Sequence, residues 1–141
     1  MLPICNINLR IAKPCIKPYP PKDDTSLGAE MKRKRLDLEW TQQEVANFFE
    51  VRKDSYQNWE WNERMPHIKH RKKVVEFLSF NYWDDKSCSL SNRCLLYRIE
   101  HQITRSEMEK LIGVTKMTID RIENNKLGIS KDNIKKVKVL F

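Results

Sequence analysis

TQQEVANFFEVRKDSYQNWEWN, residues 41–62, has the pattern of two short helices joined by a tight turn. Thr41 and Glu44 have the spacing of a capping box, in which the hydroxyl accepts from the Glu44 amide and the carboxylate accepts from the Thr41 amide. Apolar residues follow at helical spacing, so we expect a helix to begin directly after Thr41. Tyr56 and Trp59, three residues apart, would give a second helix its buried face and leave polar side chains outside.

The same pattern occurs a second time in the chain. A shift of 63 residues aligns residues 27–78 with residues 90–141 without a gap, and apolar residues stand opposite apolar residues at every expected core position. The capping box recurs as Thr104 and Glu107, and isoleucines replace the aromatic pair of the second helix. Such repetition predicts two copies of one small helical unit.

The predicted protein is all-α. An extended arm at residues 1–26 precedes a first helical domain at 27–79, a linker spans 80–89, and a second helical domain follows at 90–141. The periodicity predicts four helices in each domain. For six of these helices the pattern predicts both ends: residues 27–38, 67–79, 90–101, 105–112, 116–125 and 130–141. We expect the linker to pack between the domains through its three aromatic side chains, Phe80, Tyr82 and Trp83.

The arm contains five of the six prolines, which favours an extended chain over a helix. Alternating apolar residues permit a short strand at residues 4–11, without a partner strand elsewhere in the chain. Two interpretations of the arm stay open: a plain tether, or a segment whose basic residues follow DNA phosphates. Those basic residues are Arg10, Lys13, Lys17 and Lys22.

The charge balance favours a polyanionic partner. The 141 residues carry a net charge of +8, and the pI is near 9.4. Residues 27–78 contain 11 Lys and Arg against 9 Asp and Glu, a net charge of +2, whereas residues 90–141 contain 11 against 6, a net charge of +5. The second domain therefore holds most of the positive excess. No apolar run could span a membrane and no secretory signal opens the chain, so we expect a cytoplasmic protein.

The sequence contains no pattern typical of an enzyme, a metal site or a cofactor site. The spacing of zinc ligands is absent from the four cysteines, Cys5, Cys15, Cys88 and Cys94, which favours reduced thiols. His67 and His70 stand three residues apart without a third ligand nearby, which favours a surface pair. The chain has three glycines, no glycine-rich phosphate loop, no HExxH motif and no nucleophile beside a base. We therefore expect no catalysis, no metal, no cofactor and no small-molecule ligand.

A family resemblance rests on short motifs in both copies. In the first copy these are Thr41, Gln42, Glu44, Val45, Ala46, Val51, Trp59 and Glu60. In the second copy they are Thr104, Glu107, Gly113, Val114, Thr115, Thr118, Ile119 and Glu123. Both sets resemble the Cro/repressor-type (XRE-family) helix-turn-helix DNA-binding domains. The resemblance implies two tandem lambda-repressor-like domains in a bacterial or phage protein. Such a protein would bind double-stranded DNA site-specifically and regulate transcription, with repression as the first expectation.

The resemblance also implies roles by position. In that family the N-terminal end of the third helix enters the major groove, and the second helix lies across the phosphate backbone. The implied DNA-binding residues are Gln42, Lys53, Asp54, Ser55, Gln57 and Asn58 in the first copy, and Arg105, Lys116, Met117, Thr118, Asp120 and Arg121 in the second. Lys and Arg suit guanine, Asp suits cytosine, and Gln and Asn suit adenine. The family also pairs an arginine of the first helix with a glutamate of the third, here Arg35 with Glu60 and Arg98 with Glu123.

Each copy departs from the family pattern in a different place. Glu50 replaces the usual glycine at the turn, so a residue there is expected to adopt a positive φ at a cost of about 1 kcal/mol. Arg52 stands where Ser or Thr normally caps the third helix. Glu109 replaces a small alanine in the second copy and could splay its helices. One copy could therefore serve dimerisation in a homodimer, while the Thr115 cap and the larger charge favour the second copy as the DNA binder.

Two rival functions keep the same fold. A protein-interaction module, such as an antitoxin or an adaptor, would hold a partner with the aromatic linker and the Pro-rich arm. A degenerate structural fusion partner would bind nothing. Binding to a random duplex that weakens steeply as salt rises would favour DNA binding over both rivals.

Overall fold

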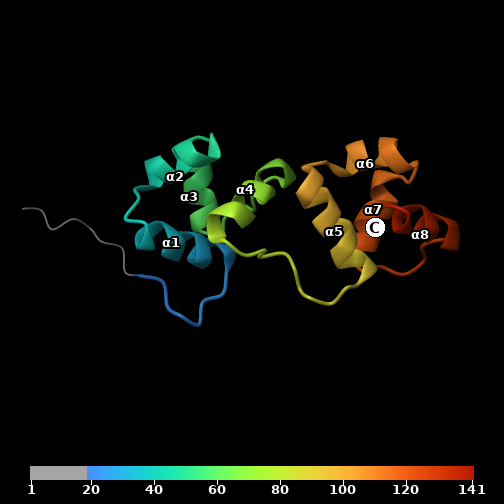
Figure 1. The fold of residues 1–141 in the computed structure, drawn as a ribbon, viewed down its shortest axis with the longest axis horizontal. Helices are drawn as coiled ribbons and strands as arrows, with labels where there is room; N and C mark the ends of the chain where they lie inside the picture. The colour runs from blue at the N-terminus through green and yellow to red at the C-terminus, as the bar shows by residue number, and fades with distance from the viewer. Residues whose placement is uncertain (1–18) are drawn as a thin grey trace, which may run out of the picture.

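The protein is all-α over the part of the chain that the structure describes, as expected. The computed structural model describes residues 19–141, and this part contains eight helices and no strand (Figure 1). The helices are α1 (Leu27–Asp37), α2 (Gln42–Phe49), α3 (Lys53–Glu60), α4 (Ile68–Leu78), α5 (Leu90–His101), α6 (Arg105–Ile112), α7 (Lys116–Glu123) and α8 (Lys131–Lys138). α5 and α6 have the predicted bounds. The strand expected at residues 4–11 lies outside the described residues.

Local capping interactions set the helix starts. The Glu44 amide donates to the Thr41 hydroxyl at 3.2 Å, and the Thr41 amide donates to the Glu44 carboxylate at 2.6 Å. A capping box with the same two distances precedes α6. α7 is capped by Thr115, whereas Arg52 makes no capping side-chain hydrogen bond before α3. Glu50 ends α2 with a φ of 58°, the positive φ expected at the turn. Despite these departures, α3 and α7 have the same length of eight residues.

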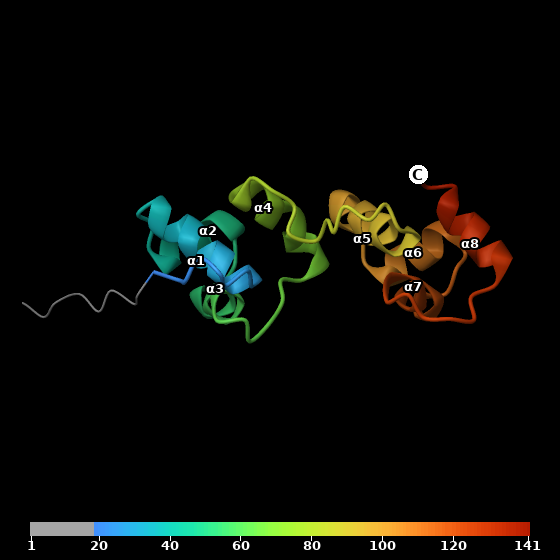
Figure 2. The same ribbon diagram turned by 90° about the horizontal axis from the view of Figure 1, so that it is seen from below.

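The helices form two groups of four, α1–α4 and α5–α8, and each group encloses a hydrophobic core (Figures 1 and 2). Large buried side chains include Phe49 and Tyr56 in the first core and Met108 and Ile119 in the second. Corresponding helices begin 63 residues apart in all four cases. α2 buries three side chains, whereas α6 buries only Met108 and places Glu109 in a half-buried position. The splay expected from Glu109 stays a prediction.

Helices α4 and α5 join the two groups. They pack against each other, and two ion pairs cross the junction. Lys72 Nζ of α4 lies 2.8 Å from a carboxylate oxygen of Glu100 in α5. Lys69 Nζ lies 3.7 Å from a carboxylate oxygen of Glu107 in α6. Because exposed ion pairs contribute little stability, these two contacts add little to the free energy that holds the groups together.

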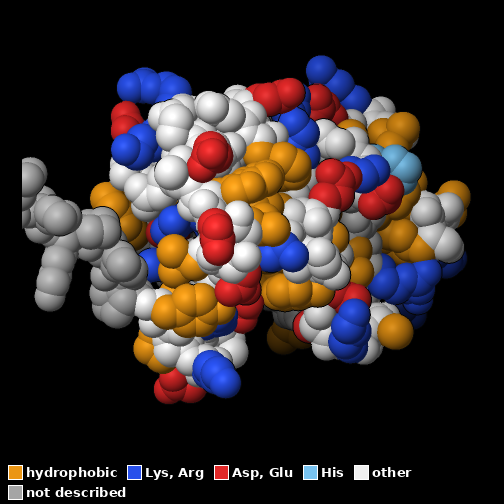
Figure 3. Space-filling view, turned by 60° about the vertical axis from the view of Figure 1, so that its left-hand side comes forward, with side chains coloured by type: hydrophobic (Ala, Val, Ile, Leu, Met, Phe, Trp, Pro, Cys, Tyr) orange, Lys and Arg blue, Asp and Glu red, His pale blue; other side chains and the backbone are white. Residues whose placement is uncertain are grey.

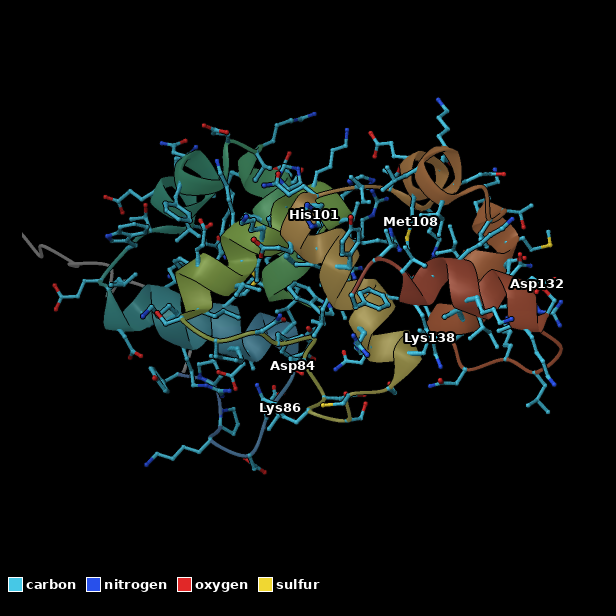
Figure 4. The ribbon with its side chains drawn as sticks, turned by 45° about the vertical axis from the view of Figure 1, so that its right-hand side comes forward. Asp84, Lys86, His101, Met108, Asp132 and Lys138 are labelled. Carbon is cyan, nitrogen blue, oxygen red and sulfur yellow. The ribbon has the colours of Figure 1, made fainter. Side chains whose placement is uncertain are left out.

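The expectation that the linker aromatics pack between the two groups is wrong. Tyr82 and Trp83 are half-buried against the core of the first group, and Phe80 is 46% exposed. Further along the linker, Lys86 Nζ lies 2.7 Å from Asp84 Oδ2, and Figure 4 labels both residues. The two rings therefore bury apolar area on the first core and not at the junction of the two groups.

Apolar side chains stay exposed at matching positions of the two groups. Phe48 in α2 is 40% exposed, and Leu111, 63 residues later in α6, is 60% exposed. Val139, beside Leu111, is 84% exposed. Figure 3 shows hydrophobic side chains in separate patches among charged ones on the face that it presents. Each patch would offer apolar contacts to a protein partner.

Candidate nucleic-acid interface

Helices α3 and α7 carry the predicted DNA-reading residues, and their inner faces are anchored in the two cores. α3 packs on α1 and α2, and α7 packs on α5 and α6. Tyr56 and Trp59 of α3 are at most 6% exposed, as are Ile119 and Ile122 of α7. Burial of one face fixes the rotation of each helix and turns the intervening polar residues outward. In Figure 2 both helices lie along the same edge of the molecule.

Some of the predicted DNA-binding residues are exposed: Lys53, Asp54, Lys116, Met117 and Arg121. Lys53 and Lys116 occupy the same position, the first residue of α3 and of α7. No ion pair within residues 19–141 includes either lysine. Arg121 is engaged in part, since its Nη2 donates to the Leu127 carbonyl at 2.7 Å. The two lysines are therefore the side chains most available to a base edge or a phosphate.

Four other predicted residues are engaged with one another. Gln57 Nε2 donates to Gln42 Oε1 at 2.8 Å and links α3 to α2. At the corresponding positions of the second group, Arg105 Nη2 lies 3.2 Å from Asp120 Oδ1 and links α6 to α7. An amide pair in one group is thus an ion pair in the other. Each pair helps to set the angle between the two helices and leaves only its remaining polar groups for DNA. Neither pair was predicted: both positions differ between the two copies, but no local spacing along the chain places the two side chains next to each other.

The remaining three predicted residues, Ser55, Asn58 and Thr118, are half-buried. The Thr118 hydroxyl lies 2.9 Å from the Thr115 hydroxyl, and the Thr118 amide donates to that same hydroxyl. Thr118 therefore helps to cap α7. Ser55 and Asn58 therefore expose only a part of their surface to a ligand.

Both arginine–glutamate pairs implied by the resemblance form beneath this interface. Arg35 donates from Nε and Nη2 to the two carboxylate oxygens of Glu60, each at 2.8 Å, and the Glu60 side chain is 1% exposed. Arg98 Nη1 donates to Glu123 Oε1 at 2.6 Å, and that carboxylate is 4% exposed. Arg105 occupies the other oxygen of Glu123, with its Nε at 2.9 Å. The first group thus has one arginine on its buried glutamate, and the second group has two.

The buried carboxylate of Glu60 makes the first group sensitive to acid. Burial is the largest influence and raises the pKa of Glu60, but the hydrogen bonds and charge of Arg35 outweigh it and hold the pKa below its ordinary value of 4.5. The unfolded chain therefore takes up this proton at a higher pH than the folded chain. The stabilisation is fully present above about pH 4.5 and is lost as the pH falls through the lower folded value.

Urea unfolding followed by tryptophan fluorescence tests this acid sensitivity, because all four tryptophans lie between residues 40 and 83. We expect the free energy of unfolding to fall as the pH drops below 4.5 in the wild type, and to fall less steeply in Glu60→Gln. Glu63→Gln changes an exposed carboxylate three residues away and should leave the slope as it is. Equal slopes in the wild type and Glu60→Gln would contradict the assignment.

The histidines and cysteines of the described part show no metal-site geometry. Among residues 19–141, no three or more His, Cys, Asp or Glu side chains are placed to hold a metal ion. His67 caps α4, and the His70 ring packs on a tryptophan. Burial raises the pKa of the Cys94 thiol to about 12, which keeps this side chain protonated in the second core. Within the same residues, no helix has both the length and the apolar character needed to cross a membrane.

Comparison with known proteins identifies one family over part of the chain. Residues 96–137 match a family described as helix-turn-helix. This range contains α6 and α7 whole, and with them every DNA-binding candidate of the second group. No curated protein and no solved structure gives a significant match.

Proposed function

We propose that this chain, which carries a helix-turn-helix motif at residues 96–137, binds double-stranded DNA at specific sequences and represses transcription. The observation that carries the proposal is the outer face of α7. Lys116, Met117 and Arg121 are exposed there, while Ile119 and Ile122 fix the helix in the core. With this face in the major groove, the free amides at the start of α6 would meet a phosphate. Basic side chains would find the acceptors of guanine.

We also propose that residues 27–79 form a second helix-turn-helix domain. This domain would recognise a second short DNA sequence, or box, next to the one that α7 contacts. The common 63-residue displacement of all helix starts, the two capping boxes and the two buried arginine–glutamate pairs support this. Because α3 and α7 lie along one edge in Figure 2, one duplex could contact both helices. α7 is proposed as the main reader, since Thr115 caps it and its group carries the larger positive charge.

Alanine variants test which helices read DNA. On a duplex selected from a randomised pool, Lys53→Ala and Arg121→Ala are each expected to weaken binding by about 1–3 kcal/mol if the contact is to a base. Lys116→Ala is the matched partner of Lys53→Ala, because the two lysines begin their helices at the same position. Lys138→Ala, at the exposed end of α8, is the control and should bind as the wild type does. Fluorescence anisotropy gives each Kd.

The selection and its salt dependence separate the alternatives. Two boxes about one helical turn apart would assign reading to both groups, and a single box would assign it to one. Affinity for a random duplex should fall steeply as salt rises. Unchanged affinity in all three helix variants would remove α3 and α7 as readers. DNA affinity that does not change with salt concentration, or no DNA binding at all, would favour a protein-interaction module.

A further inference from the structure

A hollow of about 380 Å³ lies between the two helix groups. One wall comes from the segment that leads into α4 and from Arg71 of α4 itself. The other wall comes from α5 and the start of α6, and includes Arg98, Arg105 and Ser106, with Glu123 of α7 behind them. Three arginines from three helices therefore line one small space, and only one carboxylate lines it with them.

Arg71 is the arginine without a carboxylate. No ion pair of residues 19–141 includes it. Its Nε donates to the Pro66 carbonyl at 3.1 Å, and its guanidinium carbon lies 5.0 Å from the centre of the Trp83 ring. These contacts hold the planar group in place and leave its two terminal nitrogens without a hydrogen-bond acceptor among residues 19–141. Burial lowers the pKa of Arg71, and the positive charges of Arg98 and Arg105 lower it further.

The carboxylates nearby do not balance the three positive charges. Arg98 and Arg105 take both oxygens of Glu123, and Arg105 also reaches Asp120 at 3.2 Å. Counting both carboxylates, one positive charge is left over, and it belongs to the half-buried Arg71. Guanidinium groups that line one space can donate charge-assisted hydrogen bonds to the oxygens of a tetrahedral anion.

We propose that this hollow binds a phosphoryl group, supplied either by a free phosphate compound or by the DNA backbone. Arg71 and Arg105 would donate to it from opposite walls, and Ser106 would add a hydroxyl. Because Arg71 belongs to α4 and Arg105 to α6, the bound group ties the first helix group to the second. It thereby fixes how α3 and α7 are placed relative to each other. If the phosphoryl group comes from a free phosphate compound, the proposal is independent of DNA binding. If it comes from the DNA backbone, the proposal rests on the proposed function.

The first experiment titrates the full chain with inorganic phosphate at constant ionic strength, set with sodium chloride, and follows the NMR signals of the arginine side chains. Saturable shifts centred on Arg71 and Arg105 are expected in the wild type. Ser106→Glu should weaken the phosphate Kd about tenfold or more, because it puts a negative charge at the mouth of the hollow. An acidic residue in the first turn favours a helix, so the variant should fold. Gln43→Glu adds the same negative charge at the corresponding position of α2, away from the hollow, and should bind phosphate normally.

The second experiment tests whether the DNA backbone supplies the phosphoryl group. If free phosphate does not bind, Arg71→Gln should weaken DNA binding and reduce the salt slope by about one. Arg93→Gln, an exposed arginine of α5 outside the hollow, should change neither quantity. Phosphate binding without DNA binding would support the hollow and remove the proposed function. No phosphate binding together with an unchanged salt slope in Arg71→Gln would overturn the inference.

Discussion

Replacing Arg35 with methionine is expected to lower the free energy of unfolding of the first helix group by about 3–5 kcal/mol. Arg35 supplies both charged hydrogen bonds to Glu60, whose side chain is 1% exposed. Methionine keeps an apolar stem but leaves the buried carboxylate without a cation. The side-chain amide of Gln42, whose Nε2 lies 3.3 Å from Glu60 Oε1, would remain as a neutral donor. The cost is large because a buried charge that loses its partner keeps its full desolvation penalty.

The corresponding change in the second group, Arg98→Met, should cost only about 2 kcal/mol. Glu123 would keep Arg105, whose Nε and Nη2 lie 2.9 and 2.6 Å from Glu123 Oε2. The buried carboxylate would therefore lose one charged hydrogen bond and still have a cation beside it. The difference between the two groups comes from one position, which holds Gln42 in α2 and Arg105 in α6.

Urea denaturation measures both losses, with tryptophan fluorescence for the first group and circular dichroism for the second. A rescue variant sharpens the test: Gln42→Arg added to Arg35→Met copies the arrangement of the second group and should recover part of the lost stability. Equal losses in Arg35→Met and Arg98→Met would contradict this account of the network. So would a double variant no more stable than Arg35→Met.

A methyl group at Gly28 is expected to lower the stability of the first group by about 3 kcal/mol. A Cβ at this residue would lie 2.8 Å from the Glu60 carbonyl carbon and 2.8 Å from Asn62 Nδ2. The α3 backbone cannot move away freely, because Glu60 is tied to Arg35 of the same helix that holds Gly28. The Gly28 amide also donates to Asn62 Oδ1 at 2.8 Å. α1 would have to separate from α3 and open the core between them.

The second group supplies the control for Gly28→Ala. Ser91 stands at the position that corresponds to Gly28, so that group already accommodates a Cβ. The Ser91 hydroxyl donates to the Glu123 carbonyl, and Ser91→Ala should cost only about 1 kcal/mol through the loss of this bond. Both variants are measured by urea denaturation. A loss in Gly28→Ala no larger than that in Ser91→Ala would show that α1 and α3 can separate at little cost.

Much of the fold could be predicted because its signals act over three or four residues. Thr41 with Glu44, and the same pair 63 residues later, mark the starts of α2 and α6 through hydrogen bonds within a single turn. The exposure of Lys53 and Lys116 follows in the same way, since apolar residues at helical spacing fix which face of α3 and α7 is buried. The turn at Glu50 was predictable from its position after α2.

Contacts between distant parts of the chain were decided only by the folded structure. The pairing of Gln42 with Gln57 and of Arg105 with Asp120 depends on the angle between two helices, and no local spacing encodes that angle. The linker rings cover the first core instead of the junction because competing apolar surfaces exist only once the cores have formed. Arg71 lines the same hollow as Arg98 and Arg105 for the same reason: the packing of α4 on α5 brings together charges whose spacing along the chain does not predict it.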